Sequence, residues 1–279
     1  MKISMNLLLW TTHVTEEHWP LLASLKQAGF DGVEIPIFEG EEKHYQKLGA
    51  ELRRLGLGAT AVTVMSAETN PISPEAKVRQ AAGERLKWAI GNCAALGAEI
   101  LCGPIHSALG IFTGEGPTAS EKQWAAEVLR KAAHEADQAG LRLAVEYLNR
   151  FECYFLTTAA QTKALVQAVG HPHCQLMYDT FHAHIEEKDP AAALAELGDD
   201  LIHLHVSECD RGTPGTGQVR WRETFAALKK LGYQGWYTIE AFGRSLPALA
   251  AATKVWRDLF PSQEEVYTQG LAFIKSQAA

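Results

Sequence analysis

The sequence predicts an α/β fold in which eight short strands alternate with helices, and three observations predict it. Short apolar runs alternate with longer stretches of helical period, with Gly, Asn or Asp between them. Several helical stretches are followed by a Gly suited to a helix C-cap. The 279 residues leave about 35 residues for each strand, helix and pair of loops, close to the usage of a (β/α)8 TIM barrel. We therefore expect a single TIM barrel with an added C-terminal helix.

The expected strands are short, and most are apolar on both alternating faces, as buried parallel strands should be. In chain order they cover residues 3–9, 32–37, 59–64, 99–103, 141–147, 175–178, 201–206 and 236–239. A doubly wound sheet is the structural alternative, but that fold usually places a GxGxxG turn after its first strand. Here the first strand continues into Trp10-Thr11-Thr12-His13, which favours the barrel.

The expected helices fill the intervals, at residues 17–27, 44–55, 74–96, 120–138, 158–169, 190–197 and 221–231. Gly29, Gly56, Gly97, Gly140 and Gly232 follow five of them, at the usual place for a residue in the left-handed conformation. Residues 261–279 form a further helix packed on the outside. No low-complexity linker or change of composition divides the chain, so residues 1–279 are expected to form one domain.

Charge and cysteine content argue against several classes of protein. The chain has 33 acidic and 26 basic residues, a formal net charge of -7, and such a surface repels a nucleic-acid backbone. Its five cysteines show no CxxC spacing, which argues against a disulfide framework and a structural zinc site and favours a reducing cytoplasm. No segment approaches the roughly 18 apolar residues of a membrane helix. Neither a nucleic acid nor a membrane is therefore expected as a partner.

Four consecutive expected strands, the fifth to the eighth, each end in a residue capable of chemistry. These residues are Glu146, Asp179, His205 and Glu240. The carboxyl ends of the strands meet at one rim of a TIM barrel, where its active sites lie. Three carboxylates and one imidazole form an oxygen-rich site that suits Mn²⁺, Co²⁺ or Mg²⁺. For any one of the four, a polar strand cap or an ion pair with a neighbouring Arg is the alternative interpretation.

The strand spacing gives Glu146 and Glu240 different directions of approach. Adjacent strands of an eight-stranded barrel are about 45° apart, so these carboxylates should reach a central ligand from well separated sides. Such a pair can remove a proton from one face of a carbon and return it to the other. A divalent ion on the adjacent carbonyl and hydroxyl would stabilise the enediolate that forms. This arrangement predicts epimerisation.

The same residues lie in longer motifs: EYLNRFE at 146–152, DTFH at 179–182, HVSE at 205–208 with DRG at 210–212, and IE at 239–240. Together with FDGVE at 30–34, they resemble the ketose 3-epimerases, typified by D-tagatose and D-psicose (allulose) 3-epimerases, within the xylose isomerase-like TIM barrels. The resemblance implies a catalytic metal, usually manganese, on the four strand-end residues, with Glu146 and Glu240 as the acid/base pair. It also implies that Glu152, His182 and Arg211 hold the carbonyl end of the sugar. A surface ion pair or a supporting hydrogen bond is the alternative role for each of those three.

The chain departs from the family pattern at a few positions near the expected ligand. Tyr147 stands where many relatives have Pro, and Ser66 stands where some members have Cys. Ala183-His184 follow His182 where Met-Asn is expected. These departures bear on the preferred sugar more than on the reaction.

Ser66, Trp10 and Phe242 are further candidates for contact with the sugar. Trp10 follows the first expected strand, Ser66 the third and Phe242 the eighth, so all three should lie near the catalytic rim. The glycine-rich segment 212–217 lacks the GK[ST] ending of a phosphate loop. We interpret it as a turn that positions Arg211, and we expect a free sugar rather than a sugar phosphate.

The sequence therefore predicts a metal-dependent ketose 3-epimerase, with Mn²⁺ as the expected ion, that interconverts C3 epimers of free ketohexoses or ketopentoses. Example pairs are D-tagatose/D-sorbose, D-fructose/D-psicose and ribulose/xylulose. The resemblance also implies a homodimer or homotetramer. The alternative within the superfamily is a sugar isomerase such as hydroxypyruvate isomerase. A nuclease similar to endonuclease IV, which the net charge opposes, and a sugar-binding barrel without catalysis are less favoured.

Overall fold

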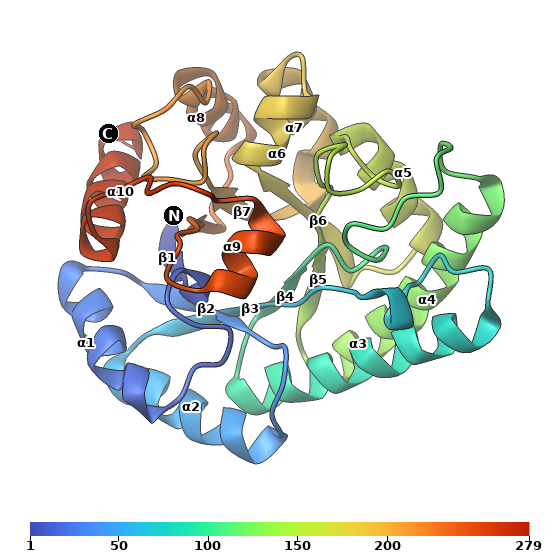
Figure 1. Cartoon of the computed structure of the whole chain (residues 1–279), viewed down its shortest axis with the longest axis horizontal. Coiled ribbons are helices and arrows are strands. Elements are labelled where there is room, and N and C mark those ends of the chain that lie inside the picture. Colours follow the sequence, from blue (N-terminus) through green and yellow to red (C-terminus); the bar gives the residue numbers. More distant parts are fainter. Residues whose placement is uncertain (279) are drawn as a thin grey trace.

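The computed structural model describes residues 1–278 and shows a closed barrel of parallel strands in the order β1 to β8, with β8 paired to β1 (Figure 1). The strands are β1 Lys2–Asn6, β2 Gly32–Pro36, β3 Gly58–Val62, β4 Ile100–Gly103, β5 Arg142–Val145, β6 Cys174–Asp179, β7 Leu201–Val206 and β8 Trp236–Ile239. The predicted fold class, a TIM barrel, is confirmed.

Helices surround this barrel on its outer face (Figure 1). The α-helices are α1 Trp19–Ala28, α2 Glu42–Leu55, α3 Ala76–Leu96, α4 Ala119–Gln138, α5 Ala159–Val169, α6 Thr180–Glu186, α7 Pro190–Leu197, α8 Trp221–Leu231, α9 Pro247–Thr253 and α10 Gln263–Ala278. Short 3-10 helices η1 Leu7–Leu9, η2 Glu16–His18, η3 Ala67–Thr69 and η4 Gly198–Asp200 lie between these elements.

The first strand is shorter than expected because its last residue caps a helix. Asn6 accepts a hydrogen bond from the backbone N–H of Leu8 through its side-chain oxygen, at 2.8 Å, and η1 follows directly. Side-chain capping of this kind competes with continuation of a strand. The fifth strand likewise ends early, at Val145, so Glu146 is the first residue of the loop that follows.

Two short helices, α6 and α9, were not expected. Asp179 ends β6 and also caps α6, since its Oδ1 accepts the N–H of Phe181 at 2.6 Å. α9 has Pro247 at its start, where a fixed φ favours the first helical turn. In Figure 1, α9 lies in front of the barrel.

The expected C-terminal helix is confirmed as α10, which packs on the outside against α8 and β8. The ring of Phe273 lies 5.1 Å from the ring of Trp221 on α8. Gly270 permits the close approach to β8, because a Cβ at this position would lie 2.9 Å from Ile239 Cδ1.

The interior of the barrel is unusually polar. Side chains from strands that are not neighbours meet there, such as Glu34 on β2 and His205 on β7. The interior of a TIM barrel is usually filled by branched apolar residues, so this polar layer marks the region beneath the strand ends. No helix in residues 1–278 is long and apolar enough to cross a membrane. The interpretation of residues 1–279 as one domain stays a prediction.

Candidate active site

The four predicted metal ligands converge at the carboxyl ends of β5 to β8, and all four are buried. His205 Nδ1 lies 3.3 Å from Glu240 Oε1 and 3.6 Å from Asp179 Oδ2. The same nitrogen lies 4.0 Å from Glu146 Oε1. Three carboxylates from three strands therefore surround one imidazole nitrogen.

His205 carries the feature that fits a divalent ion. Its Nε2 lies 2.7 Å from Glu34 Oε1, a hydrogen bond in which the carboxylate can only accept. Its Nδ1 is buried and has no hydrogen-bond partner among residues 1–278. In the neutral form of His205, Nδ1 carries a lone pair that faces three carboxylates, and this is a donor arrangement that a metal ion would satisfy.

The three carboxylates differ in how readily they ionise. Burial acts to raise the pKa of Asp179, but the nearby Arg211, His182 and His205 together outweigh burial and hold this pKa below its usual range. Burial raises the pKa of Glu146 well above its ordinary value, and the neighbouring Asp179 and Glu240 carboxylates add to this effect. Burial also raises the pKa of Glu240. Two groups that can hold a proton thus lie beside one that stays ionised, as an acid/base pair requires.

Arg211 reaches the same centre from the loop after β7. Its Nη1 donates to Glu240 Oε2 at 2.5 Å, to Ser207 Oγ at 3.0 Å and to Asp179 Oδ2 at 3.2 Å. The guanidinium carbon lies 3.7 Å from the centre of the Phe181 ring. The backbone of Arg211 has a φ of 67°, a left-handed conformation that is costly for a residue with a side chain.

The glycine-rich segment 212–217 folds around a buried carboxylate, that of Glu208. This carboxylate accepts four hydrogen bonds, from the backbone N–H groups of Cys209, Gly215 and Val219 and from Trp221 Nε1. Gly217 is required at its position because a Cβ there would lie 2.6 Å from Glu208 Oε1. Arg211 donates its own backbone N–H to the Glu208 carbonyl at 2.9 Å. The segment is therefore a turn, as the sequence suggested, and it is held by hydrogen bonds to Glu208, three residues before Arg211.

His182 and Arg211 present two donors to one point. His182 Nδ1 accepts the backbone N–H of Asn149 at 2.9 Å, and burial lowers the pKa of His182 to about 4. The neutral imidazole therefore carries its proton on Nε2, which lies 3.6 Å from Glu146 Oε1 and 3.1 Å from Arg211 Nη2. An acceptor oxygen placed between the two donors would satisfy both. Glu152 lies nearby, held at 2.8 Å by the Asn149 side chain.

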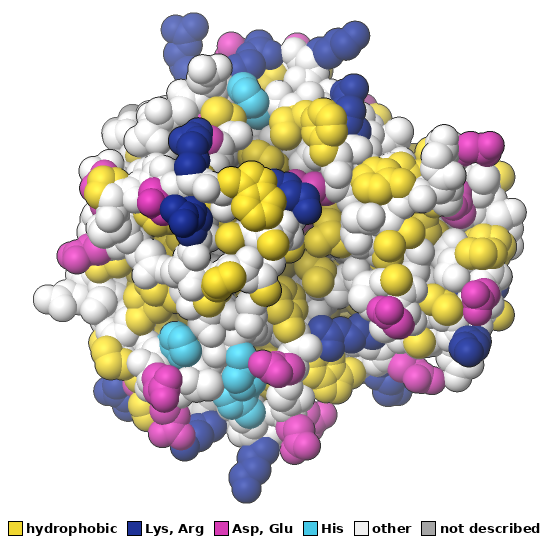
Figure 2. Space-filling model, viewed as in Figure 1, with side chains coloured by type: hydrophobic (Ala, Val, Ile, Leu, Met, Phe, Trp, Pro, Cys, Tyr) yellow, Lys and Arg dark blue, Asp and Glu magenta, His cyan; other side chains and the backbone are white. Residues whose placement is uncertain are grey.

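A cavity of about 280 Å³ opens onto this centre. Six of the residues singled out in the sequence line it: Glu146, Glu240, Glu152, His182, Arg211 and Phe242. Apolar side chains also line it, among them Leu8, Phe38, Val62 and, from α9, Leu249. Hydrophobic side chains gather around the centre of this face of the molecule (Figure 2). Cavities of this size are at the small end of ligand sites, which suits a small polar ligand with an apolar edge.

Two predicted sugar contacts do not line this cavity. Ser66 is exposed and donates its hydroxyl to Glu68 Oε2 at 2.7 Å. Trp10 packs toward α10, with its ring 6.2 Å from the ring of Tyr267. Their contact with a sugar stays a prediction.

The departures from the family pattern also lie off the cavity wall. Tyr147 and Ala183 are buried, His184 is exposed on α6, and none of the three is among the lining residues. They can act on the preferred ligand only through residues that touch it, such as the neighbouring Glu146 and His182.

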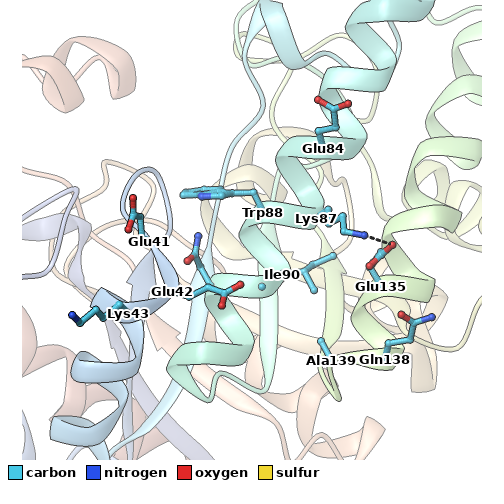
Figure 3. Close-up of a pocket in the computed structure, with 12 residues that line it drawn as sticks. Glu41, Glu42, Lys43, Glu84, Lys87, Trp88, Ile90, Glu135, Gln138 and Ala139 are labelled. Carbon is cyan, nitrogen blue, oxygen red and sulfur yellow. Dashed lines mark hydrogen bonds and ion pairs between the residues drawn. The ribbon is translucent and has the colours of Figure 1, made fainter.

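A larger hollow of about 830 Å³ lies far from this centre, on the outer face between α2, α3 and α4. Figure 3 shows its lining, with Trp88 and Ile90 among Glu and Lys side chains and Lys87 paired to Glu135 at 3.1 Å. None of the predicted site residues lines it.

The sequence did not single out Asn6, Glu34 or the cavity wall from α9. A signal for Glu34 was present, since a charged residue in the otherwise apolar run GVEIP is unusual in a buried strand. Asn6 at the end of an apolar strand is a weaker signal of the same kind. α9 offered none beyond a proline before a short apolar run.

Comparison with known proteins agrees with this geometry. A family model for the xylose isomerase-like TIM barrel matches residues 22–277. The chain is 31% identical to the ketose 3-epimerase of Arthrobacter globiformis, over 99% of this chain and 96% of that protein. It is 30% identical to a probable ketose 3-epimerase of Synechocystis sp., over 99% and 96% of the two chains. The structure of a D-allulose 3-epimerase from Methylomonas sp. in complex with D-allulose aligns with a TM-score of 0.93 at 28% identity, over 99% of this chain and 97% of that one.

The chain therefore belongs to the xylose isomerase-like TIM barrels. Within that class it is a member of the ketose 3-epimerase family, and it is an isomerase.

Proposed function

We propose that this protein is a divalent-metal-dependent ketose 3-epimerase that inverts C3 of free ketohexoses or ketopentoses. One observation carries the proposal. Two buried carboxylates with raised pKa values, Glu146 and Glu240, line one small cavity from strands three positions apart in the barrel. A carbon held between them is accessible to a proton carrier on each face.

Glu146, Asp179, His205 and Glu240 would hold the metal ion, with Mn²⁺ preferred and Co²⁺ or Mg²⁺ as alternatives. When bound, the ion would offset the charge of the three carboxylates and polarise the carbonyl of the substrate.

Proton transfer is then divided between the two glutamates. One glutamate takes the proton from C3, the electron pair of the C–H bond becomes the C2=C3 double bond, and the π pair of the C2 carbonyl moves to its oxygen to give an enediolate. The other glutamate, protonated beforehand, donates to the opposite face of C3. The C2 carbonyl forms again and the configuration at C3 is inverted. A raised pKa suits both glutamates, because each must be able to exist as the carboxylate or as the protonated carboxylic acid near neutral pH.

The polar end of the cavity supports binding of the carbonyl end of a ketose. Arg211 Nη2 and His182 Nε2 lie 3.1 Å apart, close enough to donate to one substrate oxygen, and Glu152 can accept from a substrate hydroxyl. The only arginine among the described residues that line the cavity, Arg211, already contacts Glu240 and Asp179. A phosphate group would lack a free cationic partner among the described lining residues, which supports a free sugar.

The test is a panel of ketoses incubated with Mn²⁺-loaded enzyme in D₂O, with products separated by chromatography. We expect C3 epimers that carry deuterium at C3. Glu146→Gln and Glu240→Gln should each reduce turnover at least 100-fold, while Glu84→Gln, an exposed position on α3, should leave it unchanged. Exchange at C1 with formation of an aldose would instead favour an isomerase such as hydroxypyruvate isomerase.

We further propose a homodimer or homotetramer located in the cytoplasm. Sedimentation or light scattering on the purified protein tests the assembly, and a monomer at micromolar concentration would contradict it.

A further inference from the structure

A fully buried carboxylate, Glu34, lies directly beneath the metal-ligand cluster. Its Oε1 accepts from His205 Nε2 at 2.7 Å and from Asn6 Nδ2 at 3.0 Å. Its Oε2 accepts from three more groups, His203 Nε2 at 2.7 Å, Thr60 Oγ1 at 2.9 Å and Cys102 Sγ at 3.2 Å. Five donors from four different strands, β1, β3, β4 and β7, thus fix the position of one carboxylate.

Glu34 determines which nitrogen of His205 is free. A carboxylate only accepts, so Nε2 must carry the proton of a neutral imidazole and Nδ1 must carry the lone pair. Nδ1 is the atom that faces Glu146, Asp179 and Glu240. Without Glu34 the proton could move to Nδ1, where it would compete with a metal ion.

Asn6 extends the same control to Glu240. An amide NH₂ has two N–H bonds, and Asn6 directs one to Glu34 Oε1 at 3.0 Å and the other to Glu240 Oε1 at 3.3 Å. The amide oxygen is used as well, since it accepts from Leu8. Glu240 Oε1 is also the oxygen closest to His205 Nδ1. Two predicted ligands, His205 on β7 and Glu240 directly after β8, are therefore both linked by hydrogen bonds to one carboxylate on β2.

The lower cluster of Glu34, Cys102, His203 and His205 could itself be taken for a metal site, because its donor atoms lie within 4.8 Å of one another. The distances argue for hydrogen bonds instead. His203 Nε2 and His205 Nε2 each lie 2.7 Å from a Glu34 oxygen. Two ligand atoms of one tetrahedral zinc ion are instead about 3.4 Å apart. The cluster is a hydrogen-bonded support.

We propose that Glu34 and Asn6 are positioning residues that hold His205 and Glu240 ready for the metal ion. This inference rests on the proposed metal-dependent function. Neither residue lines the cavity, so both act through the ligands that they orient.

The primary test compares Glu34→Gln with Thr60→Val. Each variant removes one buried hydrogen-bonding feature of the same cluster, but only the first alters the partner of His205. Titration calorimetry on metal-stripped protein should show the Kd for Mn²⁺ raised about 10- to 100-fold in Glu34→Gln and unchanged in Thr60→Val. The visible spectrum of the Co²⁺-loaded protein should change only in Glu34→Gln.

A second variant covers the case in which Glu34→Gln does not fold. Glu34→Asp keeps the charge but withdraws the carboxylate by about one bond length, roughly 1.5 Å, and should also raise the Kd, by at least about 5-fold. Wild-type affinity in every folded Glu34 variant, or an equal loss in Thr60→Val, would overturn the proposal. If the wild-type enzyme epimerises ketoses without binding Mn²⁺, the proposed function fails instead.

Discussion

Replacing Glu208 with Gln should loosen the loop that carries Arg211. Each oxygen of this buried carboxylate accepts two hydrogen bonds, all between 2.9 and 3.1 Å. Burial acts to raise the pKa of Glu208, but these donors outweigh burial and lower it, so the group is ionised at neutral pH.

The size of the effect follows from the number of donors. Gln keeps one acceptor oxygen and places an NH₂ group where two N–H donors already point. Each buried N–H left without an acceptor costs about 1–3 kcal/mol, so two of them should lower the free energy of unfolding by about 2–6 kcal/mol. The left-handed backbone of Arg211 depends on the same loop, so its contacts with Glu240 and Asp179 should weaken as well.

Urea denaturation followed by circular dichroism measures the stability, and kcat/KM with Mn²⁺ measures the effect on the site. The matched control is Thr216→Ala, which removes a 2.7 Å hydrogen bond to the Thr213 carbonyl within the same loop and should cost about 1 kcal/mol. A loss below about 1 kcal/mol for Glu208→Gln, or normal kcat/KM in a clearly destabilised variant, would refute this reasoning.

Three further outcomes are expected. Treatment with EDTA should abolish turnover and lower Tm, because an ion present at 100 times its Kd adds about 2.7 kcal/mol of stability; turnover that survives metal removal would contradict this. Burial lowers the pKa of His106 to about 3. Between about pH 6.5 and 3, His106 is therefore protonated in the unfolded chain but neutral in the folded protein. Stability should therefore fall as pH drops from about 6.5 towards 3, by up to about 1.4 kcal/mol per pH unit from this residue, and an unaltered slope in His106→Asn would count against it. Leu249→Ala on α9 should raise KM about 5-fold, for roughly 1 kcal/mol of lost apolar contact, with little change in kcat. Leu246→Ala, outside the cavity wall, is its control and should keep the wild-type KM.

The barrel and the convergence of four strand-end side chains could be predicted because both follow from local sequence patterns. Strand period, glycine caps and the residue at each strand end are visible without tertiary contacts. Glu146, Asp179, His205 and Glu240 were found in this way, and the structure brings them together.

Contacts across the barrel could not be predicted in the same way. Glu34 is recognisable as a buried charge, but the residues around it in β2 do not indicate that it pairs with His205 and His203 on β7. The limits of the strands also depended on capping by Asn6, which competes with the strand pattern. α9 is too short for helical period to reveal it, and its place on the cavity wall is set by the fold alone.

The hydrogen bond between Asn6 and Glu240 joins residues 234 positions apart. It lies at the seam where the first strand meets the last, so the site cannot be assembled until nearly the whole chain has been synthesised and the barrel has closed. Contacts of such long sequence separation form late in folding. An ion that binds only the closed form would stabilise this seam. Binding of the metal ion would then indicate that the barrel has closed as well as that the active site is assembled.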